Sequence, residues 1–81
     1  MVLPPQIIIS PNPASKYLNI YTDYNGPNLN GFIFDLLGHK ITEVNLNNNF
    51  ERVDISNYNK GIYYLKIKSI EHLVIKKFIV E

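Results

Sequence analysis

The sequence predicts an all-β protein, a small antiparallel β-sandwich of about seven strands. Short apolar stretches recur at intervals of roughly ten residues along the chain. Asparagine, glycine and proline, which disfavour strand interiors and favour turns, separate these stretches. No window of useful length shows the periodicity of an amphipathic helix. These observations together favour many short strands joined by tight turns.

The clearest strand covers residues 60–68 and is entered through Gly61. Because successive side chains of a strand point to opposite faces, its residues divide into two sets. The core face carries Tyr63, Leu65 and Ile67, and the solvated face carries Ile62, Tyr64, Lys66 and Lys68. Gly61 can adopt either the positive φ or the crowded backbone conformation that entry into a strand can require.

Alternating apolar residues place the other strands, and turn residues delimit them. The expected strands cover residues 6–10, 17–22, 31–35, 40–46, 50–55 and 73–80. In the fourth strand, Ile41 and the pair Val44 and Leu46 must occupy opposite faces. The last strand alternates imperfectly, with Lys76 on one face and Lys77 on the other among apolar residues. A bulge, or a strand that changes partners, would reconcile that pattern.

Turn residues predict the connections between these strands. Pro11-Asn12-Pro13 fixes φ twice and withholds two N–H donors, so we expect an ordered turn outside the sheets. Gly38 is expected at positive φ in a hairpin over residues 36–39, and residues 47–49 form a polar loop. Three further connections complete the chain: a loop centred on Asn25-Gly26-Pro27, one helical turn capped by Asp54 or Ser56 through Tyr58, and a turn over residues 69–72.

Length and composition limit the possible functions. A chain of 81 residues makes one domain, expected over residues 7–81 after a linker remnant at 1–6. It has no cysteine for a disulfide or a thiolate metal site, and its net charge of +1 argues against strong binding to nucleic acid. No apolar run is long enough to span a membrane, and residues 1–10 do not resemble a signal peptide.

The residues that carry catalytic chemistry form no recognisable pattern. His39 and His72 lack neighbouring residues at metal-ligand spacing. None of the serines lies in a nucleophile elbow, and Asp23-Tyr24-Asn25-Gly26 lacks the further carboxylates of a calcium loop. We therefore expect no enzyme activity, no metal and no cofactor.

Three motifs occur in a fixed order along the chain. The first is Pro11-Asn12-Pro13-Ala14, followed by Leu18-Asn19-Ile20. The second is Ile33-Phe34-Asp35-Leu36-Leu37-Gly38-His39-Lys40-Ile41. The third is Val53-Asp54-Ile55-Ser56 through Gly61-Ile62-Tyr63, leading to Lys76-Lys77-Phe78-Ile79-Val80. In this order they resemble the C-terminal sorting domain of the type IX secretion system, type A, of Bacteroidota, from about Ile9 to Glu81.

The resemblance implies a fold and a function. Such a domain is a small immunoglobulin-like β-sandwich at the end of a larger exported cargo protein. The outer-membrane secretion machinery recognises it, and a sortase-like peptidase commonly removes it, which leaves the cargo secreted or on the cell surface. The resemblance places its recurring features on Pro11, Asn12, Pro13, Gly61, Tyr63, Lys76 and Lys77. His39 stands where the family usually has lysine or arginine, and Tyr58 where leucine is common.

Two other classes of function remain open from the residues alone. Tyr17, Tyr21, Tyr24 and Tyr64 could stack on a glycan or a base, with a basic stripe of Lys66, Lys68 and Lys76. A carbohydrate-binding or adhesion module of a secreted protein would fit this pattern, and so would assembly through an unpaired sheet edge. Each of the seven recurring residues also has a purely structural interpretation. These are a rigid turn for Pro11, Asn12 and Pro13, backbone geometry and core packing for Gly61 and Tyr63, and a solvated edge for the two lysines.

Overall fold

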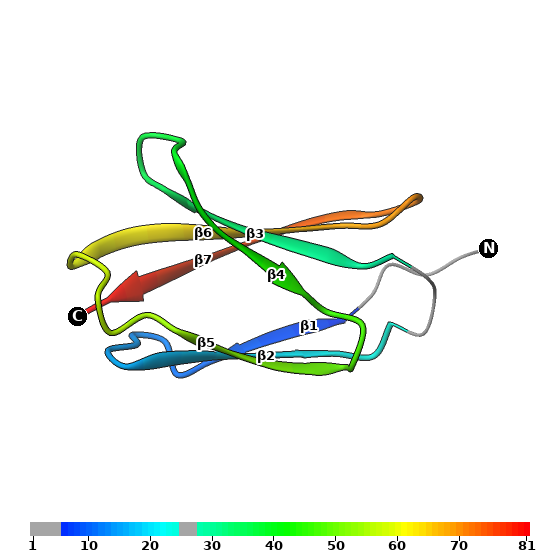
Figure 1. Ribbon diagram of the computed structural model, residues 1–81, viewed down its shortest axis with the longest axis horizontal. Helices are drawn as coiled ribbons and strands as arrows, with labels where there is room; N and C mark the ends of the chain where they lie inside the picture. Colours follow the sequence, from blue (N-terminus) through cyan, green and yellow to red (C-terminus); the bar gives the residue numbers. More distant parts are fainter. Residues whose placement is uncertain (1–5, 25–27) are drawn as a thin grey trace.

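A computed structural model describes residues 6–24 and 28–81 and confirms an all-β sandwich of seven strands in two antiparallel sheets (Figure 1). The strands are β1 (Ile7–Ser10), β2 (Tyr17–Thr22), β3 (Asn30–Asp35), β4 (Lys40–Asn45), β5 (Phe50–Asp54), β6 (Gly61–Lys68) and β7 (Leu73–Val80). Each lies within two residues of its expected position. The loop centre at residues 25–27 and most of the expected linker, residues 1–5, lie outside the described residues.

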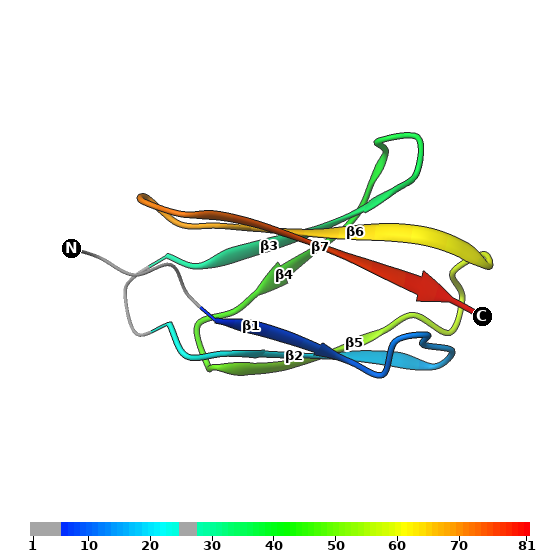
Figure 2. The ribbon, with the colours of Figure 1, turned by 180° about the vertical axis from the view of Figure 1, so that it is seen from behind.

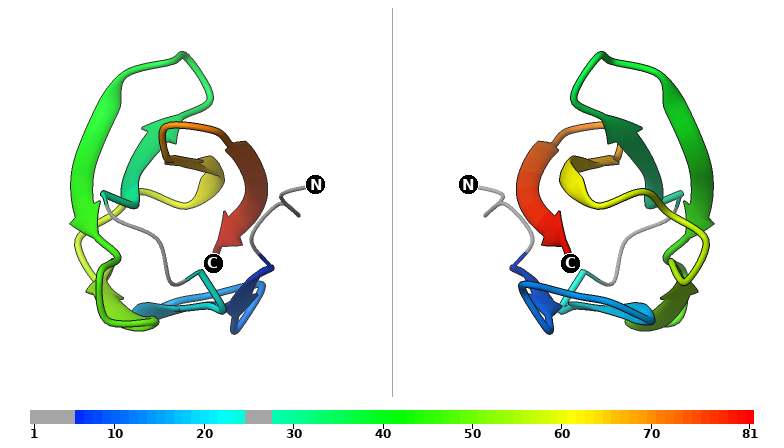
Figure 3. Two further views of the ribbon diagram at one scale, coloured as in Figure 1. Left: turned by 90° about the vertical axis from the view of Figure 1, so that its right-hand side faces the viewer. Right: turned by 90° about the vertical axis from the view of Figure 1, so that its left-hand side faces the viewer.

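The two sheets form two layers that enclose the core. One sheet has the strand order β1-β2-β5, and the other has the order β4-β3-β6-β7. Figures 1 and 2 show these layers from their two sides. The end-on views of Figure 3 place the edge strand β4 beside β5 on one flank, and the edge strand β7 beside β1 on the other. Both sheets therefore present their edges along the same two flanks.

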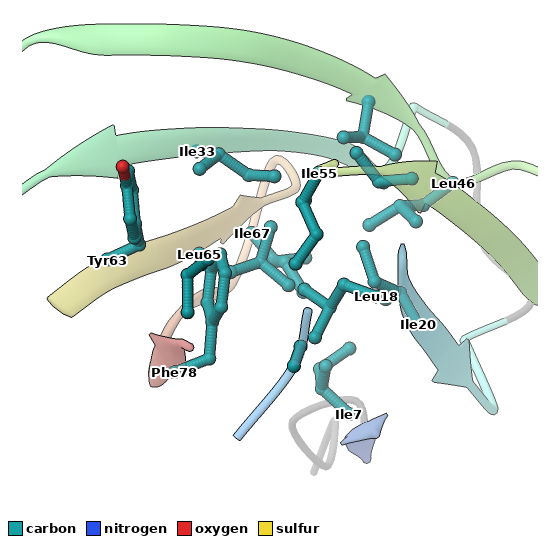
Figure 4. Packing of buried hydrophobic residues seen from close by; sticks show 14 of the residues in the cluster. Ile7, Leu18, Ile20, Ile33, Leu46, Ile55, Tyr63, Leu65, Ile67 and Phe78 are labelled. Carbon is teal, nitrogen blue, oxygen red and sulfur yellow. The ribbon is translucent and has the colours of Figure 1, made fainter. Parts of the chain in front are cut away.

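Alternation along the strands fills the space between the layers. Leu18 and Ile20 of β2 face Leu65, Ile67 and Phe78 of the other sheet, all of them fully buried (Figure 4). Burying each such side chain stabilises the fold by about 1.5–3 kcal/mol. The expected core face of β6 is confirmed, because Tyr63, Leu65 and Ile67 are buried. In β4, Val44 takes the core side, with Leu46 buried just beyond the strand, and Ile41 is exposed.

Glycine has a defined role at one of the connections and inside the core. Gly38 has a φ of 90° in the β3–β4 hairpin, as expected. Gly31 lies inside the core, where an added Cβ would come within 3.2 Å of the Leu46 Cδ1 atom. A larger residue at position 31 would therefore have to displace Leu46, whose side chain is 2% exposed.

Two local expectations are wrong. Residues 55–58 form a hydrogen-bonded turn and not a helical one: Tyr58 N donates to Ile55 O, and Asp54 Oδ1 accepts hydrogen bonds from the backbone N and the Oγ of Ser56. Asp54 satisfies the local backbone as a cap would, but the chain enters β6 at once. These bonds from Ser56, its hydroxyl first, also hold the pKa of Asp54 below its usual value.

The last strand has no bulge. β7 pairs with β6 without a register shift from Leu73 to Val80, and the one shift in the sheet lies between Ile33 and Phe34 of β3. The imperfect alternation has a simpler cause, since Ile75 and Ile79 are apolar residues on the solvated face. β7 does gain a second neighbour near its end, where Val80 forms a parallel bridge with Ala14.

Candidate recognition surface

The Pro-Asn-Pro turn is attached to the last strand through its asparagine. Asn12 Nδ2 donates to Lys77 O at 3.3 Å, and Asn12 Oδ1 accepts from Ile79 N at 3.0 Å. A side-chain amide has the same donor and acceptor as a peptide group. Asn12 therefore occupies the place of a neighbouring strand, although more than 60 residues separate it from β7. Both proline peptide bonds of the turn are cis.

Ala14 continues this pairing along the same edge of β7. Ala14 N donates to Ile79 O at 2.8 Å, and Glu81 N donates to Ala14 O at 2.9 Å. The Ala14 side chain is 1% exposed and belongs to the core. The C-terminal half of β7 is thus bonded on both edges, to β6 on one and to the turn on the other.

Gly61 and Tyr63 lie on the opposite side of β7 from the turn. Gly61 pairs with Val80 and has a φ of 151°, a positive value that favours glycine, as the sequence predicted. Tyr63 pairs with Phe78, and their rings stack with centroids 5.7 Å apart. The Tyr63 hydroxyl donates to Asn59 O at 2.7 Å. Because Tyr63 is only 7% exposed, its direct role is to support β7 from inside.

The two neighbouring lysines point in opposite directions. Lys76 pairs with Leu65, so its side chain starts on the inner face of the sheet, where it is half-buried. Lys77 pairs with Tyr64 on the outer face and is exposed. Of the two, Lys77 is therefore the one that offers its ammonium group openly to a partner.

Five of the seven candidate residues lie toward one end of the sandwich, and Lys76 and Lys77 lie near the middle of β7. Figure 2 shows the turn after β1, the start of β6 and the end of β7 at the same end of the molecule. We call residues 11–14 and 77–81 the turn–strand surface. Its exposed members include Pro11, Asn12, Pro13 and Lys77. The position of Asn12 between two prolines was the sequence signal for an ordered turn, but its attachment to β7 could not be read from the sequence.

A small hollow adjoins this surface. It has a volume of about 130 Å³ and is lined by Pro11, Ser15, Lys16 and Tyr17. Pockets for small molecules usually measure about 300–1,000 Å³. The turn–strand surface therefore suits contact with a macromolecule better than capture of a small ligand.

The aromatic and basic residues that left a glycan- or base-binding module open do not form a single surface. Tyr17 and Tyr21 lie on the outside of the three-stranded sheet, where they contact Arg52 and Phe50, with centroid distances of 4.3 and 4.9 Å. Tyr64 lies on the outer face of the other sheet with Lys66, whereas Lys76 points inward. Tyr17 and Tyr21 lie on the outer face of one sheet and Tyr64 and Lys66 on that of the other, so these residues do not share one surface.

One pair of residues with catalytic character does come together. His39 Nδ1 lies 3.0 Å from Asp35 Oδ2 in the β3–β4 hairpin, a contact that the sequence analysis did not foresee. Asp35 Oδ1 accepts hydrogen bonds from the backbone N of His39 and of Leu37, and the His39 bond is the main reason why the pKa of Asp35 lies below its usual value. The Asp35 side chain closes a turn in this way. Within residues 6–24 and 28–81 no three potential metal ligands form a cluster.

Comparison with known protein families identifies the family to which this chain belongs. A family model described as the secretion system C-terminal sorting domain matches residues 8–81, nearly the whole chain. The comparison with curated proteins found no match. Across the described part of the chain, no helix is long and apolar enough to cross a membrane.

Proposed function

Because this chain belongs to the family of type IX secretion system C-terminal sorting domains, we propose that it directs a larger cargo protein across the outer membrane. The cargo precedes the domain in the full-length protein. The domain acts by being recognised and not by catalysis. A sortase-like peptidase then separates it from the cargo, which reaches the medium or the cell surface.

The match over residues 8–81 is the observation that carries this proposal. Membership of the family implies a sorting signal and a secreted or cell-surface protein. The convergence of the family's recurring residues adds support, since the turn and the last strand are joined through Asn12. Recognition of a joined surface would report that the domain has folded, because the turn–strand surface exists only when both ends of the chain meet.

A fusion experiment tests the proposal. Residues 1–81 are placed behind a signal peptide and a fluorescent reporter, in a Bacteroidota host with the secretion system intact and in one with it deleted. We expect the reporter in the medium or on the surface of the intact host only. Reporter held in the periplasm of both hosts would contradict the proposal.

The contribution of the terminal segment needs point variants and not a deletion. Removing residues 76–81 would also remove Phe78 and Val80 from the core, so loss of export would not separate recognition from folding. Lys77→Ala removes an exposed ammonium group without touching the core, and Lys60→Ala, in the exposed connection before β6, is a matched control. We expect reduced export for Lys77→Ala alone, measured as the fraction of reporter outside the cell.

A further inference from the structure

The outer edge of β7 is closed along one half and open along the other. On this edge Asn12 and Ala14 bond to Lys77 O, to both backbone groups of Ile79, and to Glu81 N. Backbone groups of alternate residues in an antiparallel strand point to the same edge. The N–H and C=O groups of Leu73 and Ile75, and the N–H of Lys77, therefore share this edge. No hydrogen bond reaches them from the part of the chain that the structure describes.

The side chains around the open half are apolar and basic. Leu73 and Ile75 are 56% and 58% exposed on the outer face. Their cross-strand neighbours on β6 are Lys68 and Lys66, and Lys77 continues the same face. On the inner face Val74 and Lys76 are half-buried. Residues 61–80 contain four lysines and a single acidic residue, Glu71.

We propose that residues 73–77 of β7 form a strand-addition site for an extended, acidic segment of a partner protein. Such a segment pairs with the open backbone groups and places alternate side chains on each face. Apolar side chains contact Leu73 and Ile75, and carboxylates pair with Lys66, Lys68 or Lys77. This deepens the proposed sorting function and rests on it, since the partner then belongs to the secretion machinery.

The closed half limits the length of the added strand. Asn12 holds Lys77 O, so an incoming strand loses its pairing partners beyond Lys77. Five residues of β7 remain, which is close to the usual length of a short strand. The turn–strand surface therefore sets the register of the partner as well as protecting the end of the sheet.

Charge favours an acidic partner over a second copy of this chain. Pairing of two β7 strands would bring eight lysines and only two acidic residues from the two β6–β7 hairpins together. Like charges placed close together across an interface oppose association. A segment with carboxylates at alternate positions instead supplies the opposite charge and the same backbone pairing.

A proline substitution tests the site without breaking the sheet. The Ile75 N–H does not bond to β6, so Ile75→Pro removes only an outward donor, and proline is tolerated at such edge positions. Glu43→Pro is the matched control, because the Glu43 N–H points outward on β4, the other edge of the same sheet. Ile75→Thr keeps the N–H and removes apolar surface. Circular dichroism and thermal unfolding check that each variant folds.

The probe is the fluorescein-labelled peptide Val-Thr-Val-Thr-Glu-Thr-Glu-Thr, whose valines and glutamates share one face of a strand. The control peptide has lysine in place of glutamate. Fluorescence anisotropy with the 81-residue chain should show saturable binding of the acidic peptide only. We expect Ile75→Pro to weaken it at least twentyfold, Ile75→Thr two- to fivefold, and Glu43→Pro less than twofold. Absence of binding, equal binding by Ile75→Pro, or equal binding of the basic peptide would overturn the proposal.

The export assay separates this proposal from the proposed function. If the wild-type tail is exported and folded Ile75→Pro is not, while Glu43→Pro is, both proposals stand. Export of Ile75→Pro at the wild-type level would overturn the strand-addition site and leave the sorting function intact. Light scattering tests whether a second copy of the chain occupies the site. If the mass of the wild type doubles with concentration while Ile75→Pro stays monomeric, the acidic partner is overturned.

Discussion

The two halves of β7 have the same partner on one side and different surroundings on the other. Both halves pair with β6 in one unbroken register. The C-terminal half is also bonded to Asn12 and Ala14 and buries Phe78 and Val80. In the N-terminal half no described residue bonds to the outer edge, and Leu73 and Ile75 are exposed. The comparison shows that one strand can combine a structural anchor with a surface available for contact.

The two halves differ because the unpaired edge of the sheet is covered by described residues along one half and not along the other. Unpaired edge groups are a template for association with another chain, and proteins usually cover or charge them. This domain covers one half of the edge with a short turn that contains two prolines. Within residues 6–24 and 28–81, only nearby lysines protect the other half. Variants that change either half should therefore affect different properties, stability in the first and association in the second.

Truncation in the core of the closed half should have the largest effect. Phe78→Ala removes a fully buried ring and should lower the free energy of unfolding by about 3–5 kcal/mol. Ile75→Ala, in the open half, should change it by less than about 0.5 kcal/mol. Urea unfolding monitored by circular dichroism measures both. Equal losses would show that the two halves of β7 contribute equally to the stability of the fold.

Removal of the asparagine amide should have the next largest effect. Asn12→Ala deletes two hydrogen bonds to β7 and should cost about 1–3 kcal/mol. Asn12→Asp keeps the acceptor for Ile79 N–H and loses the donor to Lys77 O, so we expect an intermediate loss. The control is Asn57→Ala, since the Asn57 side chain forms no hydrogen bond within the described residues. A neutral Asn12→Ala would mean that Ala14 alone closes the edge.

Hydrogen exchange should resolve the two halves residue by residue. The amides of Ile79 and Glu81 are bonded across the edge, whereas the amide of Ile75 faces outward. We expect at least tenfold slower exchange for Ile79 and Glu81 than for Ile75, by NMR. In Asn12→Ala, exchange at Ile79 should accelerate more than exchange at Glu81. Fast exchange at all three positions in the wild type would remove the distinction between the halves.

Replacing Lys76, the inward-facing lysine of the open half, should slightly increase the stability of the fold. Lys76 is half-buried opposite Leu65, so Lys76→Met keeps the apolar stem and removes the charge. We expect the free energy of unfolding to rise by up to about 1 kcal/mol. Lys77→Met on the outer face should leave it unchanged within about 0.5 kcal/mol. A loss of stability in Lys76→Met would show that the Lys76 ammonium group makes a stabilising contact.

Acid should have the smallest effect on β7. Because the folded-state pKa of Asp35 is lowered, chiefly by the backbone N–H of His39, the ionised carboxylate stabilises the β3–β4 hairpin at neutral pH. That contribution is lost as the pH falls through the lowered pKa. Asn12 and Ala14 do not titrate, so exchange protection at Ile79 should persist at a pH where protection at His39 declines. NMR hydrogen exchange at the Ile79 and His39 amides measures this difference. Asp35→Asn is the control, because it lacks the ionised carboxylate at every pH.

The sequence by itself determined the strands and their inward faces. Alternation places Leu18 and Ile20, and Tyr63, Leu65 and Ile67, on core faces because the period of a strand is two residues. Turn chemistry likewise fixed Gly38 and Gly61, since positive φ is a local property. The ordered motifs also indicated the family.

Only the tertiary structure decided which surfaces these elements form. The bonds from Asn12 to Lys77 and Ile79 join residues more than 60 positions apart, and no local pattern encodes such a contact. The opposite directions of Lys76 and Lys77 follow from parity, but which one is covered depends on where the second sheet lies. Strand periodicity is set by the backbone alone, whereas the closed and open halves of β7 exist only because distant segments pack together.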